Sequence, residues 1–220
     1  MIEVYETKER INADNNLVAE NTRKILRDKN IFFINLMASP GAGKTTLLKQ
    51  TINALKDEYR IAVMEADVDS DVDAKEIEKL GVRVIQLHSG GLCHMDADMT
   101  SRGLDKLGLE DLDIIFLENI GNLVCPAEFD VGANLKVMIL SIPEGDDKPL
   151  KYPLMFEVSD IVLVNKIDAL PVFDFDKNKF KDNVRLRNKN SSIIYLSALT
   201  GEGINEWIEL LKNKIEGWKN

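Results

Sequence analysis

The sequence contains only two cysteines, and no apolar run in it approaches the length needed to cross a bilayer. Two cysteines cannot supply a network of disulfides, so we expect Cys93 and Cys125 to be free thiols or metal ligands in a reducing compartment. Residues 1–12 carry mixed charges and lack the apolar stretch of a secretory signal. These absences predict a cytoplasmic protein that does not enter a membrane.

A surplus of basic residues is also absent, since 37 acidic residues outnumber 28 basic ones and give a net charge of -9. Binding nucleic acid or an anionic membrane by general electrostatics needs a basic face, so we expect neither as a partner. Proline and glycine are too few for a disordered chain, and 45% hydrophobic residues are typical of a globular protein. The length of 220 residues fits one domain, residues 1–220.

Short apolar runs alternate with helical stretches along the chain. The run at 31–37 ends at a turn, as does a strand buried on both faces of a parallel sheet. Further runs lie at 61–64, 82–87, 114–117, 135–140, 161–164 and 193–196. Helices are expected between most of them, for example at 45–57, 74–80 and 204–215. This alternation predicts an α/β fold, a mostly parallel sheet with helices on both faces.

An amphipathic helix is expected to lead into the domain. Asp14 is its predicted N-cap, and its apolar residues recur at helical spacing: Leu17, Val18, Ile25 and Leu26. Ligands of such parallel sheets bind at the carboxyl ends of the strands, and the polar motifs of this sequence follow its expected strands.

The first expected strand runs directly into a phosphate-binding motif. Residues 38–45 read ASPGAGKT and match G-x-x-x-x-G-K-S/T, except that Ala38 replaces the first glycine. Glycine lets backbone N–H groups turn toward phosphates, and the helix that follows adds the positive end of its dipole. Lys44 is expected to reach the β- and γ-phosphates as a catalytic residue, and Thr45 to hold Mg²⁺. The predicted nucleotide-binding residues of this loop are Gly41, Ala42, Gly43, Lys44, Thr45 and Thr46.

A second motif predicts which base is bound, because residues 165–168 read NKID after the run at 161–164. The Asp168 carboxylate can accept hydrogen bonds from the ring N–H and the exocyclic amine of guanine, a pair that adenine lacks. We expect Lys166 to lie along the base and Asn165 to brace the phosphate loop. Ser197 and Ala198, after another expected strand, are predicted to offer backbone N–H groups to the guanine carbonyl. Together these residues indicate GTP.

Two loops carry residues expected to act near the γ-phosphate. In the acidic loop at 65–74, Asp67 is predicted to hold Mg²⁺ and Asp73 to orient or activate the attacking water as a catalytic residue. The run at 114–117 ends in Glu118, a third predicted Mg²⁺ ligand, and Gly121 is expected to donate its N–H to the γ-phosphate. Neither loop contains an arginine or glutamine suited to aid hydrolysis. We therefore predict a GTPase with slow intrinsic turnover, accelerated only by a partner or by dimerisation.

A separate group of side chains, Cys93, His94 and Cys125, is suited to Zn²⁺ or Ni²⁺. Neighbouring residues of a strand point to opposite faces, so Cys93 and His94 can share an ion only from a loop or a helix start, which Gly90 and Gly91 favour. Cys125 follows the second loop closely, and nucleotide state is thus expected to change metal affinity. The alternative is that these are ordinary buried cysteines and a satisfied histidine.

Three longer segments resemble the HypB family of SIMIBI-class P-loop GTPases, which insert nickel during maturation of nickel-iron hydrogenase: residues 39–48, 93–97 and 118–127. The similarity runs from near residue 15 to the C-terminal helix. It implies a GTP-dependent homodimer that holds nickel or zinc with Cys93, His94 and Cys125 near the subunit interface. It also implies two partners, the hydrogenase large-subunit precursor and a small zinc-containing nickel chaperone.

The N-terminal cysteine motif and the histidine-rich tail of some family members are missing, so the resemblance does not extend to high-affinity nickel capture or storage. Four alternatives stay open. A related GTPase for urease would carry a compact Cys-Pro-His segment, which is absent, and one for a cobalamin-dependent mutase would lack the Cys-His and Cys-Pro pairs found here. A metabolic P-loop kinase leaves residues 165–168 unexplained. A nucleotide-dependent scaffold would bind no metal.

Overall fold

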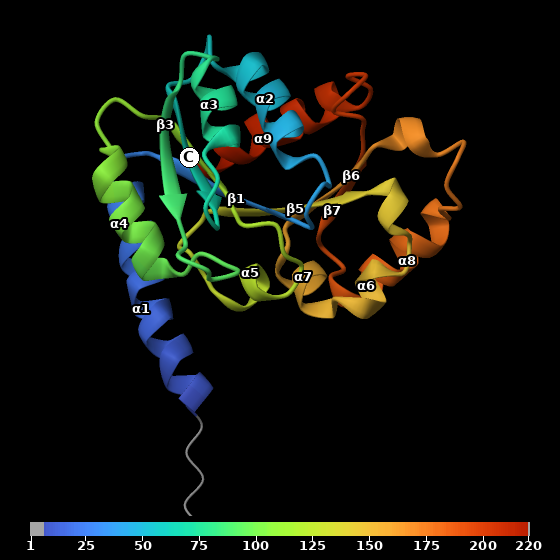
Figure 1. Ribbon diagram of the computed structural model, residues 1–220, viewed down its shortest axis with the longest axis horizontal. Helices are drawn as coiled ribbons and strands as arrows, with labels where there is room; N and C mark the ends of the chain where they lie inside the picture. The colour runs from blue at the N-terminus through green and yellow to red at the C-terminus, as the bar shows by residue number, and fades with distance from the viewer. Residues whose placement is uncertain (1–6, 220) are drawn as a thin grey trace, which may run out of the picture.

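The apolar runs form a seven-stranded sheet in the computed structural model, which describes residues 7–219 and, for residues 7–12, the backbone alone (Figure 1). All neighbouring strands pair in parallel, in the order β3-β2-β4-β1-β5-β6-β7. The strands are β1 (Phe32–Ala38), β2 (Ile61–Asp67), β3 (Arg83–His88), β4 (Ile114–Glu118), β5 (Leu135–Ser141), β6 (Ile161–Asn165) and β7 (Ser192–Tyr195). Each predicted run is therefore a strand, which confirms the predicted fold class.

Helices follow most strands and cover both faces of the sheet (Figure 1). They are α1 (Thr7–Asp28), α2 (Lys44–Leu55), α3 (Val72–Glu78), α4 (Ala97–Leu107), α5 (Cys125–Glu128), α6 (Lys148–Lys151), α7 (Pro153–Val158), α8 (Lys177–Arg187) and α9 (Ile204–Lys219), with 3-10 turns η1 (Ile142–Glu144) and η2 (Ile167–Ala169). Among the helices of residues 7–219, none is both long and apolar enough to cross a membrane. The predicted domain bounds, 1–220, include residues 1–6 and 220, which lie outside the described part of the chain.

The strand β1 shows why the apolar runs are continuous. All of its residues are buried. Phe32 and Ile34 belong to a core shared with α2, α3 and α9, whereas Phe33 packs into the core beneath α1 and α4, and Met37 into the core beneath α7 and α8. Successive side chains of a strand point to opposite faces, so a strand covered on both faces favours apolar residues at nearly every position. Asn35 is the polar exception in β1, and its Oδ1 accepts a hydrogen bond from another buried side chain. Each such side chain contributes about 1.5–3 kcal/mol when fully buried.

The helix α1 begins before the residue predicted to cap it. It starts at Thr7, so Asp14 lies inside the helix and the predicted N-cap is wrong. No proline or glycine occurs between these two residues, so nothing in that segment ends the helix. Its buried face is a stripe spaced by three and four residues: Ala19, Thr22 and Leu26. Leu17, which was expected to share that apolar face, is 72% exposed.

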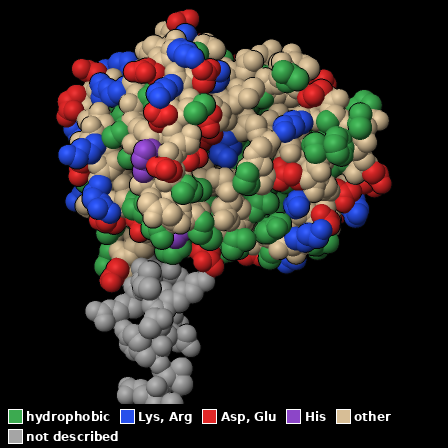
Figure 2. Space-filling view, viewed as in Figure 1, with side chains coloured by type: hydrophobic (Ala, Val, Ile, Leu, Met, Phe, Trp, Pro, Cys, Tyr) green, Lys and Arg blue, Asp and Glu red, His purple; other side chains and the backbone are tan. Residues whose placement is uncertain are grey.

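Acidic and basic side chains are interspersed over the face of the molecule seen in Figure 2, and on this face they do not gather into a continuous basic surface. Elsewhere in the described chain ion pairs join oppositely charged side chains, for example Lys212 Nζ and Glu58 Oε1 at 2.6 Å. On this face, and with a net charge of -9 over the chain, a phosphate group would be held by local geometry rather than by a broad positive field.

The central strand β1 lies between β4 and β5, and the chain turns from its carboxyl end directly into α2. At this point connections leave toward both edges of the sheet, which opens a crevice beyond the carboxyl ends of the strands. The phosphate motif, the acidic loop after β2 and the loop after β4 all start at this edge. The sheet topology thus gathers segments that are far apart in sequence, because the strands that precede them are parallel and their carboxyl ends meet at one edge.

Candidate nucleotide and metal sites

A cavity of about 570 Å³ lies at the carboxyl ends of β1, β2 and β4. It is lined by residues of the phosphate motif, of the two loops expected to act near the γ-phosphate, and of the base motif. The predicted site residues among them are Gly41, Gly43, Lys44, Thr45, Thr46, Asp67, Asp73, Glu118, Gly121 and Lys166. The structure therefore brings most of the predicted nucleotide residues to one hollow.

The base motif and the phosphate loop form one hydrogen-bonded unit. The Asn165 side chain donates from Nδ2 to the Ala42 carbonyl at 2.8 Å, and Lys166 donates from Nζ to the Gly41 carbonyl at 2.7 Å. Gly43 has a φ of 95°, and a Cβ added there would lie 2.5 Å from Asn165 Nδ2. Only glycine fits this left-handed and crowded position. The arrangement matches the expected bracing role of Asn165.

The carboxylate of Asp168, which is predicted to read guanine, is oriented by Ser197, whose hydroxyl donates to Asp168 Oδ1 at 2.5 Å. The two backbone N–H groups predicted to face the base are used inside the protein. Ala198 donates its N–H to Asn165 Oδ1 at 2.9 Å, and Ser197 donates its N–H to the Glu202 carbonyl at 2.8 Å. The second bond closes the turn after β7, and the first joins that turn to the base motif. Ser197 therefore contacts Asp168 through its side-chain hydroxyl.

A pair of buried acidic residues lines the same cavity. Thr45 donates from Oγ1 to Glu118 Oε1 at 2.8 Å, and Glu118 is in register with Glu65 on the neighbouring strand. Glu65 and Glu118 are 3% and 2% exposed, and their carboxyl oxygens lie within 4.8 Å of each other and of Asp73. The predicted ligand Asp67 lines the same cavity, but its carboxylate accepts the N–H groups of its own loop at residues 69–70.

The sequence prediction missed Glu65 because it ended the strand at residue 64, whereas β2 continues to Asp67. The feature that identifies Glu65 is its pairing with Glu118 on the neighbouring strand. This pairing is known only once the strand register is known. Glu65 Oε2 and Glu118 Oε2 are both buried without a hydrogen-bond partner among the described residues. Orphaned carboxylate oxygens beside a threonine hydroxyl are suited to Mg²⁺, so these residues fit the predicted cation.

Burial shapes the charge of this pair. It raises the pKa of Glu65 to about 11, with a further contribution from the neighbouring Glu118 carboxylate. It also raises the pKa of Glu118, but Lys44 and the hydrogen bond from Thr45 act in the opposite direction. Without a cation, Glu65 therefore carries a proton at neutral pH.

The raised pKa of Glu65 makes the free energy of unfolding depend on pH. The pKa of Glu65 is 4.5 in its ordinary state and about 11 in the fold, so between these values the folded chain binds one more proton than the unfolded chain. The contribution of Glu65 to the free energy of unfolding is fully present below pH 4.5 and is lost as the pH rises toward 11. We expect Glu65→Gln to flatten this decline in protein treated with a chelator and free of nucleotide. At about pH 9 its thermal midpoint should exceed the wild-type value by about 2–4 °C per kcal/mol gained.

The exposed residue Glu78 supplies the control, since Glu78→Gln removes a carboxylate from the surface of α3. Thermal unfolding followed by circular dichroism across the pH range measures both variants. A Glu65→Gln variant with the same slope as the wild type would show that Glu65 is ionised in the fold.

The sulfur and imidazole groups form a second cluster. Cys93 and His94 lie in the loop between β3 and α4, which confirms the expectation that they leave the strand, and Cys125 is the first residue of α5. The ligand atoms of all three lie within 4.8 Å of one another, and Cys93 Sγ is 3.8 Å from His94 Nδ1. Cys93 is exposed, which disfavours its role as an ordinary core cysteine. Two sulfurs and a ring nitrogen at these distances can share one soft or borderline metal ion.

The protonation states of His94 and Cys125 differ in how well they suit metal binding. Burial lowers the pKa of His94, and this favours the neutral imidazole that a metal binds. The Cys93 thiol and burial raise the pKa of Cys125, so an ion must displace a proton from that thiol. The His94 ring stacks on the Phe129 ring with centroids 4.0 Å apart and planes 9° apart. This contact ties the loop after β3 to the segment after α5.

A fully buried asparagine connects the two sites. Asn119 directly follows Glu118, and its Oδ1 accepts the N–H of Met95, the residue after His94, at 3.3 Å. The same oxygen accepts the Ile120 N–H at 2.9 Å. Asn119 also donates from Nδ2 to a buried asparagine of β1 at 3.1 Å. The sequence prediction missed this residue, because the bond joins loops that are 24 positions apart in sequence.

The sheet order, the phosphate loop after the central strand and the motif after β6 define a P-loop nucleotide-binding protein. Residues 32–194 match the CobW/HypB/UreG nucleotide-binding domain. The chain belongs to the HypB family of hydrogenase maturation factors. It is 44% identical over 200 residues to hydrogenase maturation factor HypB of Escherichia coli K12, and this match covers 91% of the present chain and 69% of that protein.

Two further relatives extend this result. The hydrogenase/urease maturation factor HypB of Helicobacter hepaticus is 38% identical over 209 residues, covering 93% of this chain and 86% of its own. The crystal structure of HypB from Helicobacter pylori in complex with nickel superimposes with a TM-score of 0.87 at 33% identity, covering 94% of this chain and 98% of that one. The predicted family resemblance is confirmed.

Proposed function

We propose that this protein is a cytoplasmic GTPase and metal-delivery switch that binds nickel or zinc and assists nickel insertion into nickel-iron hydrogenase. The observation that carries the proposal is the hydrogen bond from the Met95 N–H to Asn119 Oδ1, which joins the nucleotide cavity to the metal cluster. Family membership supports the hydrogenase as the client. The nickel complex of the Helicobacter pylori relative supports nickel as the cargo.

The nucleotide half of the proposal rests on the braced phosphate loop. Lys44 would contact the β- and γ-phosphates, Asp168 would read guanine, and Asp73 would orient the attacking water. Thr45 and Glu118, together with Asp67 or Glu65, would hold Mg²⁺, which supplies charge neutralisation for the phosphates when bound. Gly121 lies close to the phosphate loop, since an added Cβ would approach the nitrogen of Pro40 to 3.1 Å. This proximity supports a γ-phosphate contact from the Gly121 N–H.

The coupling half of the proposal follows from the position of Asn119. A γ-phosphate that attracts the segment after β4 would also move Asn119, and with it the backbone next to His94. The same segment leads within a few residues to Cys125. Nucleotide state would thus move both the segment with Cys93 and His94 and the segment with Cys125, through contacts that differ between the GTP-bound and GDP-bound conformations.

The partners follow from family membership and stay proposals. We infer a homodimer formed in the GTP state, a hydrogenase large-subunit precursor as client and a small zinc-containing nickel chaperone as second partner. Slow intrinsic hydrolysis fits the cavity, because among its lining residues there is neither an arginine nor a glutamine. The Helicobacter hepaticus relative carries a name that includes urease, so a urease is the second candidate client.

Nickel titration and sizing of the protein without nucleotide, with GDP and with a non-hydrolysable GTP analogue test this function. We expect nickel affinity in the GTP-analogue state to differ from that in the GDP state by about fivefold or more, the usual range of coupling between two sites. The GTP analogue is also expected to convert a monomer into a dimer. Equal affinity and equal size in all three states would exclude the switch.

A further inference from the structure

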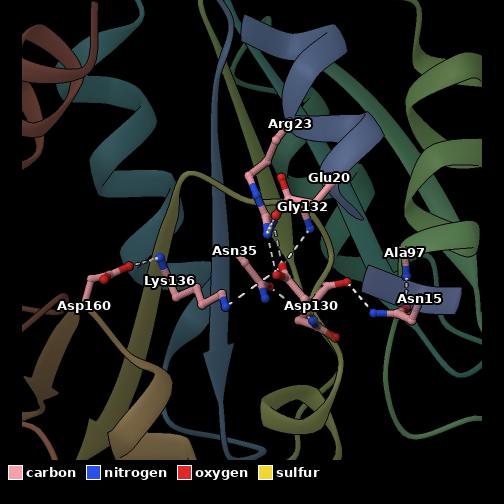
Figure 3. Close-up of polar contacts among 10 residues, drawn as sticks. Asn15, Glu20, Arg23, Asn35, Ala97, Asp130, Gly132, Lys136 and Asp160 are labelled. Atoms are coloured by element: carbon pink, nitrogen blue, oxygen red, sulfur yellow. Dashed lines mark hydrogen bonds and ion pairs between the residues drawn. The ribbon is translucent and has the colours of Figure 1, made fainter. Parts of the chain in front are cut away.

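The N-terminal helix α1 contacts both segments that carry the proposed metal ligands (Figure 3). Asn15 accepts the Ala97 N–H with Oδ1 at 2.8 Å and donates from Nδ2 to the Asp130 carbonyl at 2.9 Å. Ala97 lies three residues after His94, and Asp130 lies five residues after Cys125. One amide side chain therefore bridges the downstream ends of the two ligand-bearing segments.

The contact with Ala97 fixes the start of α4. The first N–H groups of a helix have no partner within the helix. Asp96 caps α4 by accepting the Met99 N–H at 2.8 Å, whereas the N–H of Ala97 is satisfied by Asn15 of another helix. The backbone that follows His94 is thus held from α1 as well as from its own cap.

The contact with Asp130 is reinforced two helical turns further along α1. Arg23 donates to both carboxylate oxygens of Asp130, at 3.1 and 2.6 Å (Figure 3). Asp130 Oδ1 also accepts the Gly132 N–H at 3.0 Å. An added Cβ at Gly132 would lie 2.8 Å from the Ala19 carbonyl, so α1 approaches this segment at backbone contact. The side chains of Arg23 and Asp130 are 24% and 21% exposed, so solvent screens the pair only in part.

These contacts form a closed path that passes through the proposed ligand His94. The His94 ring stacks on Phe129, which is adjacent to Asp130, and Asn15 links Asp130 back to Ala97. Three of the contacts described above therefore hold the two ligand-bearing segments together: the aromatic stack, the amide bridge and the hydrogen bond from the Met95 N–H to Asn119 Oδ1. Of these three contacts, the amide bridge is the one that comes from a helix outside the two segments.

We propose that Asn15 is a positioning residue for the site formed by Cys93, His94 and Cys125, and that α1 thereby sets the geometry in which the metal is bound. The inference rests on the proposed metal-binding function. Loss of the bridge would let the two segments separate and would disturb the placement of ligands from both. Groups that orient metal ligands from outside the site change metal affinity by about 10–100-fold when they are removed.

The test compares Asn15→Leu, which has similar size but can form neither hydrogen bond, with Asn16→Leu at the exposed neighbouring position of α1. We expect Asn15→Leu to lower nickel affinity by about tenfold and to shift the thiolate-to-nickel absorption band, and Asn16→Leu to change neither. In metal-free protein treated with oxidised glutathione, which is reduced as the Cys93–Cys125 disulfide forms, this oxidation is expected to slow severalfold in Asn15→Leu but not in Asn16→Leu, because the two sulfurs are no longer held close.

A second variant keeps the test valid if Asn15→Leu does not fold. Arg23→Gln removes the ion pair with Asp130 but leaves the Asn15 bridge, so a smaller change in the same direction is expected. Wild-type nickel affinity and wild-type oxidation rate in both folded variants would overturn the positioning role. If the wild type itself takes up neither nickel nor zinc, the metal function fails, and the oxidation rates still decide whether α1 positions the two segments.

Discussion

Replacing Asp168 with asparagine is expected to lower the affinity for Mg-GTP by at least about a hundredfold and to shift preference toward xanthosine triphosphate. A hydrogen bond to a charged group contributes about 1.5–3 kcal/mol, and the Asp168 carboxylate is proposed to accept two from guanine. Their joint loss exceeds about 3 kcal/mol, or roughly a hundredfold in affinity. Xanthine has a carbonyl where guanine has its amine, and the asparagine amide can donate to that carbonyl. Calorimetry with both nucleotides and with ATP measures the change.

The local structure supports this substitution, because the Ser197 hydroxyl that donates to Asp168 can also donate to an asparagine carbonyl. Asp174→Asn makes the same change of charge in an exposed loop nearby and serves as the control. Unchanged GTP affinity in Asp168→Asn, or equal affinity of the wild type for GTP and ATP, would show that this motif does not read the base.

Replacing Cys93 and Cys125 together with serine is expected to lower nickel and zinc affinity by at least about a thousandfold. Structural Zn²⁺ in zinc-finger peptides binds with about 10–16 kcal/mol at neutral pH, and thiolates would supply two of the three ligands proposed here. Serine does not ionise and is a poor ligand for soft or borderline ions. A loss above about 4 kcal/mol corresponds to the stated factor. Titration of the double variant with each metal, followed by absorption or by a competing chelator, measures it.

Leu92→Ala is the matched control, because Leu92 is an exposed neighbour of Cys93 and contributes no ligand. Far-ultraviolet circular dichroism checks that the double variant is folded. Wild-type affinity in the folded double variant would mean that the ion binds elsewhere, and the alternative of a nucleotide-dependent scaffold without this metal site would then be favoured.

Much of the site was predictable because its residues occur in short local patterns. A buried parallel strand, a glycine-rich loop and a helix must follow one another in sequence, so residues 38–45 are recognised without a structure. The motif at 165–168 and the cysteine and histidine pair are equally local. By contrast, the local signal at Asp14 was misleading, because a residue suited to cap a helix can also lie inside one when no breaker precedes it.

The residues that were missed share one property, since each acts through a partner distant in sequence. Glu65 meets Glu118 because β2 pairs with β4, and their register is decided by the whole sheet. Asn119 reaches Met95 across 24 positions, and Asn15 reaches Asp130 across 115 positions. A sequence shows that such polar residues are present but not which of them are buried together.

The sequence by itself determined the fold class, the phosphate loop, the base motif and the three candidate metal ligands, because each is a local pattern of side-chain chemistry. Only the tertiary structure decided that Glu65 joins Glu118, that Asn119 connects the nucleotide cavity to the metal cluster, and that α1 bridges the two ligand-bearing segments. The physical reason is that register, burial and hydrogen bonds between distant segments arise when the sheet and its covering helices pack together.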